Sequence, residues 1–173
     1  MRKVLRQVII KISIISVLLF CLVIFVPFFI FSLASRDQVI ASLPHYQSKN
    51  VYTEGIFQDF TDYGIYTFKE LKVSELENSA FFEKLSEDSI ENVLSYIDNF
   101  ENWVSEYSSQ ADPSELAENY AFDKTLVDEN DYVYIDTKEG EGEGAASYGR
   151  FDSYSVYFID ISTNTLYYFH SNI

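Results

Sequence analysis

The 173-residue sequence has little cysteine, histidine or proline, with one, two and three of these residues. Its single cysteine, Cys21, lies within an apolar run, so the chain beyond that run has no cysteine with which to form a disulfide. Small extracellular domains often rely on disulfides, and their absence favours a bacterial surface over a eukaryotic one. With so few thiols and imidazoles, a zinc site is not expected.

Signatures of nucleophilic catalysis are also missing. The sequence contains no Gly-x-Ser-x-Gly motif, and its only imidazole bases are His45 and His170. His45 falls in a segment expected to be a tether, and His170 lies near the C-terminus on a strand expected at the sheet edge. We therefore interpret both histidines as surface residues.

Acidic residues are absent from the first 36 positions. Residues 12–34 are 23 uncharged and almost wholly apolar positions, and about 20 such residues in a helix span the hydrocarbon core of a bilayer. Basic residues gather before this run, which by the positive-inside rule keeps the N-terminus cytoplasmic. We predict a cytoplasmic basic stub over residues 1–11, a transmembrane helix (a signal anchor) over residues 12–34, and export of residues 35–173. The basic residues of the stub are Arg2, Lys3, Arg6 and Lys11.

The alternative is a cleaved secretory signal. Ser32-Leu33-Ala34 places small residues at the two positions that a signal peptidase inspects, so cleavage following Ala34 would release a secreted domain. Signal peptides usually have an apolar region of about 7–15 residues, which is shorter than the run over residues 12–34. The uncleaved anchor is therefore the favoured prediction.

The exported part, residues 35–173, is strongly acidic and rich in aromatic residues. It carries eight basic against 27 acidic residues, a net charge of −19, and includes all 14 tyrosines and the single Trp103. Such a field repels phosphate backbones, so nucleic acid is not expected as a partner. A basic protein or peptide, or a cation, suits it better. The many aromatic rings supply the core of a small folded domain and argue against disorder.

The strongest periodic signal in this part predicts one long amphipathic helix over about 88–107. Its apolar residues recur at intervals of three and four. They are Ile90, Val93, Leu94, Ile97, Phe100, Trp103, Val104 and Tyr107. This helix has one face to bury against a sheet.

The rest of the chain predicts a single α+β domain over residues 51–173, preceded by a tether over residues 35–50. Two strands are expected early, separated by a break at Asp62-Tyr63-Gly64. Short helices are expected on either side of the long one. The final hairpin, with Ser162-Thr163-Asn164 at its turn, is the clearest strand prediction. The expected strands are 51–58, 64–70, 132–137, 154–161 and 165–170, and the expected short helices are 75–85 and 113–120. We predict an antiparallel sheet of about four to five strands with the long helix packed on one face.

Acidic residues on both sides of the strand 132–137 form a candidate calcium site. Part of an EF-hand spacing is present, but Tyr132 and Val133 stand where the loop needs a ligand and a glycine. The spacing leaves open a non-EF cation site shared between the 128–131 turn and the 139–143 loop. Its candidate ligands are Asp128, Asp131, Glu139, Glu141 and Glu143.

Two further kinds of site are considered. Paired carboxylates would support a small envelope hydrolase, with Asp59 and Asp62 as the first candidates. Alternatively, aromatic rings on an uncovered sheet face would recognise a protein or peptide, since tyrosine offers a large contact area with little rotamer entropy. The candidate binding residues are Tyr132, Tyr134, Tyr154, Tyr167 and Phe169.

The absence of catalytic motifs, the acidic field and the aromatic-rich sheet together favour a non-enzymatic binding or regulatory module. We expect it to be held outside the membrane through residues 12–34 and to bind a protein or peptide, with a basic partner favoured by charge. No cofactor is expected apart from the candidate Ca²⁺. A small hydrolase and a calcium-responsive domain remain as the alternatives.

Overall fold

The structure is a computed structural model that describes residues 37–56, 59–142 and 147–172. The predicted anchor over residues 12–34 and the candidate ligand Glu143 lie outside the described residues. The chain forms two compact units, Met1–Leu43 and Pro44–Ile173. In the described part of the first unit, the short helix α2 (Gln38–Ala41) is capped by the carboxylate of Asp37.

Across these three described ranges, no helix has both the length and the apolar character that a membrane crossing requires.

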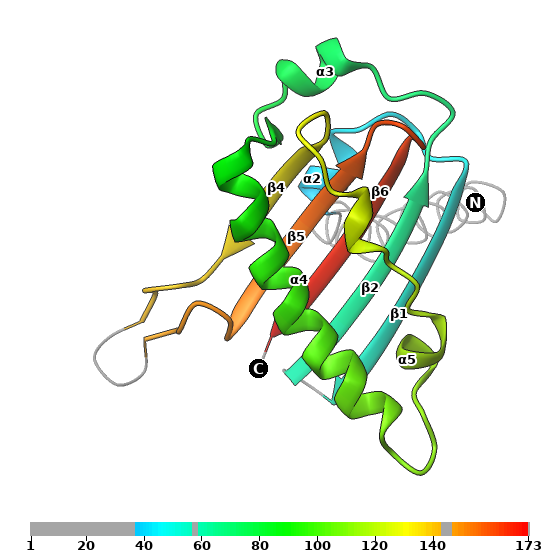
Figure 1. Cartoon of the computed structure of the whole chain (residues 1–173), viewed down its shortest axis with the longest axis vertical. Helices are drawn as coiled ribbons and strands as arrows, with labels where there is room; N and C mark the ends of the chain where they lie inside the picture. The colour runs from blue at the N-terminus through cyan, green and yellow to red at the C-terminus, as the bar shows by residue number, and fades with distance from the viewer. Residues whose placement is uncertain (1–36, 57–58, 143–146, 173) are drawn as a thin grey trace, which may run out of the picture. The chain divides into compact units, whose positions relative to one another are not determined.

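The second unit is built on a six-stranded antiparallel sheet with the order β1-β2-β6-β5-β4-β3 (Figure 1). The last strand of the chain is inserted between β2 and β5, so β6 is an inner strand and the expectation that His170 lies at the sheet edge is wrong. The strands are β1 (Ser48–Ile56), β2 (Asp59–Thr67), β3 (Glu83–Lys84), β4 (Tyr132–Thr137), β5 (Ser153–Asp160) and β6 (Thr165–Asn172).

One long helix, α4 (Glu87–Ser108), crosses one face of this sheet (Figure 1). We call this side the helix face. A capping box between Ser86 and Ser89 starts α4 and satisfies two backbone N–H groups that the first helical turn leaves free. The remaining helices are short: α3 (Val73–Glu77), α5 (Glu115–Asn119) and the 3₁₀ helix η1 (Lys124–Leu126). The predicted α+β class and the long helix are confirmed.

The core between α4 and the sheet is largely aromatic. Phe100 of α4 is fully buried, and its ring lies edge-on to that of Phe169 on β6, with the centroids 5.4 Å apart. Tyr63 of β2 is 5.7 Å from the same Phe169 ring. Large rings bury much apolar area per residue, and this packing fixes which side of each strand faces α4.

The first hairpin differs from the prediction at both ends. The strand β1 begins at Ser48, within the expected tether, and the N–H of Gln47 donates to the carbonyl of Thr67 at 2.7 Å. Gly64, expected at a break between strands, lies inside β2 opposite Tyr168. A Cβ added there would lie 3.0 Å from Cε2 of Tyr66 and 3.2 Å from the Cβ of Tyr168, so the neighbouring side chains leave little room for a larger residue.

The expected helix over residues 75–85 is also wrong in extent. The helix α3 ends at Glu77, where the side chain of Asn78 donates to the carbonyl of Ser74. The chain then extends as β3 and pairs with the start of β4, where the N–H of Leu85 donates to the carbonyl of Asp131. Pairing with β4 therefore prevails over the local helical pattern and adds the sixth strand.

Candidate functional site

A line of polar side chains crosses five strands of the sheet at one level. Direct cross-strand neighbours link Thr53 to Asp62, Asp62 to His170, His170 to Ser155, and Ser155 to Asp136. Direct neighbours in an antiparallel sheet point to the same side. We call these five residues the polar row.

The polar row lies on the side opposite α4, which we call the pocket face. Side chains alternate along a strand, so the two neighbours of a core residue point away from the core. Phe169 on β6 and Val156 on β5 are fully buried in the helix-face core. Their neighbours His170 and Ser155 therefore project from the pocket face.

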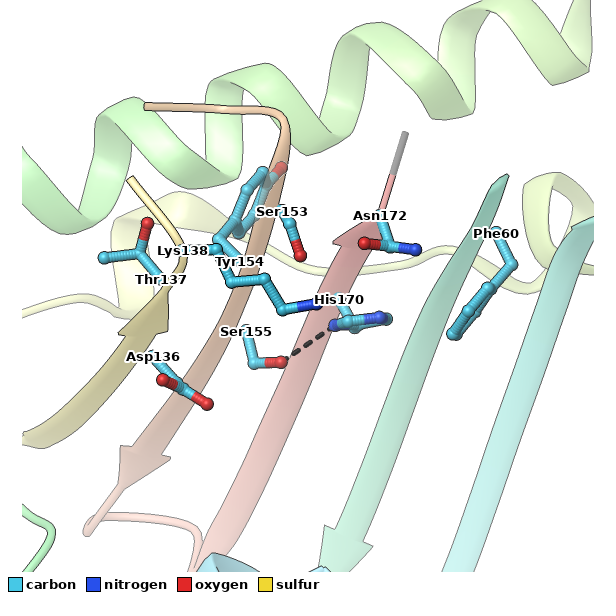
Figure 2. A pocket seen from close by; sticks show the side chains of 9 residues that line it. All are labelled: Phe60, Asp136, Thr137, Lys138, Ser153, Tyr154, Ser155, His170 and Asn172. Carbon is cyan, nitrogen blue, oxygen red and sulfur yellow. Dashed lines mark hydrogen bonds between the residues drawn. The ribbon is translucent and has the colours of Figure 1, made fainter. Parts of the chain in front are cut away.

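A pocket of about 280 Å³ opens over this row, at the end of the sheet where β2 begins and β6 ends (Figure 2). Its lining combines the aromatic residues Phe60 and Tyr154 with hydroxyl, amide, imidazole, ammonium and carboxylate groups, and so has the mixed character of a small-ligand site. Its lining residues are Phe60, Asp136, Thr137, Lys138, Ser153, Tyr154, Ser155, His170 and Asn172.

His170 is held from several sides. Its Nδ1 lies 2.8 Å from the Oγ of Ser155, within hydrogen-bonding distance. The ring of Phe60 lies 5.0 Å from the imidazole, and the ring of Tyr168 stacks at 6.1 Å with an interplanar angle of 6°. Burial lowers the pKa of His170, and the nearby carboxylate of Asp62 only partly opposes this. The imidazole is therefore expected to be neutral at pH 7.

Lys138 supplies the positive charge of the pocket. Figure 2 shows its side chain reaching over the strands toward His170 and Ser155, while the carboxylate of Asp136 lies on the far side of Ser155 from His170. Its Nζ lies 5.6 Å from the centroid of the Tyr148 ring and forms no ion pair with any carboxylate in the described ranges. Lys124, by contrast, bridges two carboxylates on α4 at 2.8 and 2.7 Å.

The hydrogen bond between Ser155 and His170 is not accompanied by the other parts of a nucleophilic site. Ser155 lies in the middle of β5 with strands paired on both sides, so its backbone is engaged in the sheet rather than arranged as an oxyanion site. One oxygen of Asp62 accepts a 2.5 Å hydrogen bond from Thr53. The arrangement suits hydrogen bonding to a ligand.

The carboxylates predicted for glycoside hydrolysis, Asp59 and Asp62, are not paired. Asp59 and Asp62 are three residues apart on β2, so they point to opposite faces of the sheet. Asp62 and Asp136 share a face but are separated by two intervening strands, roughly 14 Å at the usual strand spacing. That separation exceeds the range of about 5–9.5 Å that paired catalytic acids occupy.

The predicted aromatic binding residues do not form one surface. Tyr154 and Phe169 are buried in the helix-face core, where the Tyr154 hydroxyl donates to the carbonyl of Tyr96 on α4 at 3.2 Å. Tyr167 packs on the same side against the ring of Phe122, with the centroids 4.9 Å apart. Tyr132 and Tyr134 alone project from the opposite side, and Tyr132 is 1% exposed.

The predicted calcium ligands are divided between the two ends of β4. Asp128 and Asp131 precede the strand, whereas Glu139 and Glu141 lie beyond its other end, roughly 20 Å away at the usual rise per residue. Asp131 is buried and accepts from the N–H groups of Asp128 and Ile161, and burial raises its pKa to about 6. Among the described residues no group of three potential metal ligands comes together.

The sequence held only part of the signal for this site. Ser155 and His170 are direct neighbours because Asp160 pairs with Thr165, and each lies five residues from that pair. Counting outward from the predicted turn Ser162-Thr163-Asn164 is one residue out of register and would have placed Ser155 opposite Ser171. The partner on β2 could not be counted, because the pairing of β2 with β6 joins distant parts of the chain.

Fold and site together define a small α+β domain with a helix packed on one face of its sheet and a polar pocket at one end of the other face. The chain matches no protein-family model, no curated protein and no solved structure.

Proposed function

We propose that this protein is a membrane-anchored, extracytoplasmic binding module whose ligand is a basic segment of a protein or peptide. The pocket over the polar row carries this proposal, because it gathers a neutral imidazole, hydroxyl groups and an aromatic wall without the elements of a catalytic site. The net charge of −19 on residues 35–173 adds a field that attracts basic partners.

The position of the pocket within the sheet suits a tethered module. The chain enters the sheet at Ser48, which pairs with Thr67 at one end of β2. Phe60 lies seven residues along β2 from that point, so the pocket is roughly 23 Å from the entry end. A domain attached through its N-terminal side would thus carry the pocket on the end away from the attachment.

A labelled peptide tests the binding function. The probe is fluorescein-Lys-Lys-Lys-Lys-Gly-Ala with a free C-terminus, titrated with the full-length chain in detergent and followed by fluorescence anisotropy. We expect saturable binding that weakens with salt. Asp136→Asn, at the rim of the pocket, is expected to weaken binding about two- to fivefold, as for a single exposed charge.

Asp112→Asn provides the matched control, since it removes the same charge from an exposed loop outside the pocket. Equal effects of the two substitutions would mean that the peptide responds to overall charge alone. That result, or the absence of saturable binding, would reject the pocket as the binding site.

The proposed location has its own test. In a Cys21→Ser background, Asp112→Cys is expected to react with a membrane-impermeant maleimide on intact cells, whereas Lys3→Cys is expected to react only after lysis. The reverse pattern would contradict the proposed orientation. Recovery of the folded domain in the medium would instead favour cleavage following Ala34.

A further inference from the structure

We infer that the pocket binds a carboxylate group, and that the basic ligand presents this group as its C-terminus. The inference rests on the proposed function for the basic segment of the ligand. The carboxylate is inferred from the residues that line the pocket. Lys138, Ser155 and His170 converge on one small volume, and Asp136, the acidic residue among the described ones that line it, lies on the far side of Ser155 from His170 (Figure 2).

The first argument is charge. Lys138 brings an ammonium group into the pocket, where it forms no ion pair with a described carboxylate and lies 5.6 Å from the centroid of the Tyr148 ring. In a domain with a net charge of −19, a lysine left without such a partner in a pocket is available to an anionic ligand group.

The second argument is that the pocket offers hydrogen-bond donors, which match the acceptor oxygens of a carboxylate. An ionised carboxylate only accepts hydrogen bonds, and the ammonium of Lys138 only donates them. The hydroxyls of Ser153 and Ser155 and the amide of Asn172, which also line the pocket, add groups able to donate. Phe60 gives the pocket an apolar wall for the carbon atoms next to the carboxylate.

The third argument is that the negative charge of the domain limits how much negative charge the ligand group can carry. A strongly acidic domain repels a dianion such as phosphate more than a singly charged carboxylate. The carboxylates of Asp62 and Asp136 stand at either side of the pocket level and favour cationic groups farther along the ligand. A basic peptide that ends in a free carboxylate satisfies both conditions.

The experiment compares two labelled peptides that differ only at the C-terminus: the free acid fluorescein-Lys-Lys-Lys-Lys-Gly-Ala and its carboxamide. We expect the full-length chain to bind the free acid at least about tenfold more tightly, as for loss of a hydrogen-bonded charge. Lys138→Gln is expected to remove this preference. Lys69→Gln, which neutralises an exposed lysine outside the pocket, is expected to keep it.

Small molecules separate the two sources of a carboxylate. N-acetylglycine represents a peptide C-terminus without the basic body, with N-acetylglycinamide as its neutral control and inorganic phosphate as the dianion. Competition by N-acetylglycine, and by neither control, supports the carboxylate site. If N-acetylglycine binds, as followed by the NMR signals of His170, but neither peptide does, the site takes a free small acid and the peptide-binding function is wrong.

Three results would overturn the inference. Equal binding of acid and carboxamide peptides would leave the proposed function standing while rejecting the carboxylate. A lack of response to every probe would reject both. Phosphate binding as tightly as N-acetylglycine would also overturn it, because the pocket would then select charge rather than a carboxylate.

Discussion

The helix-face core and the pocket end of the opposite face use their side chains in opposite ways. On the helix face, Tyr63, Phe100 and Phe169 are fully buried and contact one another through their rings. At the pocket end of the opposite face, the polar row places an imidazole, hydroxyls and carboxylates at the same level of the same strands. Alternation along each strand allows one sequence to serve both faces.

This contrast separates stability from binding. Packing energy scales with buried apolar area, so the helix-face core is expected to contribute more to the free energy of folding than the pocket end of the opposite face. The polar row contributes few apolar contacts, so packing places little constraint on its side chains and they can serve ligand binding. Substitutions on the two faces are therefore expected to affect different measurements.

The largest effect is expected from a matched pair of phenylalanines. Phe100→Ala removes a fully buried ring from the helix-face core and should lower the free energy of unfolding by about 3–5 kcal/mol. Phe60→Ala removes a half-buried ring beside His170 and should cost less than about 1.5 kcal/mol. Urea unfolding of the full-length chain, followed by the fluorescence of Trp103, measures both.

The binding assay should give the reverse order. Phe60→Ala is expected to weaken binding of the labelled peptide, whereas Phe100→Ala, at a urea concentration well below its unfolding midpoint, is expected to bind like the wild type. Equal losses of stability at the two positions would contradict the division between the faces.

A smaller effect is expected from the buried acid Asp131. Its folded pKa of about 6 lies above the ordinary value near 3.8, so the fold favours the protonated form. The stability that this preference contributes is fully present below about pH 4 and is lost as the pH rises through 6. Asp131→Asn does not titrate. Its free energy of unfolding relative to the wild type should therefore rise by about 2–3 kcal/mol between pH 4 and pH 7.

Urea unfolding of both proteins at matched pH values measures this difference. Asp112→Asn, which replaces an exposed acid far along the chain from Asp131, is the control substitution. A relative stability of Asp131→Asn that falls with rising pH would mean that its two backbone hydrogen bonds outweigh burial.

The sequence was sufficient for the features that local patterns determine. The apolar spacing through Val93, Ile97, Phe100 and Val104 places α4 and its buried side, and all four residues are buried. The polar connection before Thr165 places the last hairpin. Each of these features depends on residues close together in the chain, where periodicity and turn chemistry act directly.

Features that depend on distant pairing could not be predicted in this way. Gly64 is typical of a turn when read locally, and only the neighbouring Tyr168 explains it as a strand residue. The position of β6 beside β2 makes His170 an inner residue, and no local pattern around His170 encodes that pairing. The candidate site was missed for the same reason, because the polar row is assembled by register between strands.

The smallest effect is expected in the titration of His170, and it tests the polar row directly. Burial lowers the pKa of the imidazole, with the carboxylate of Asp62 acting to raise it and the ammonium of Lys138 acting to lower it further. Asp62→Asn should therefore move this pKa down, and Lys138→Gln should move it up.

The imidazole proton signals in NMR spectra of the full-length chain report the pKa, with His170→Gln assigning the signal. Lys69→Gln should leave the pKa unchanged, because Lys69 lies outside the pocket. Opposite shifts from Asp62→Asn and Lys138→Gln are the pattern expected of a histidine that feels both charges, and shifts of the same sign would contradict this electrostatic account of the site.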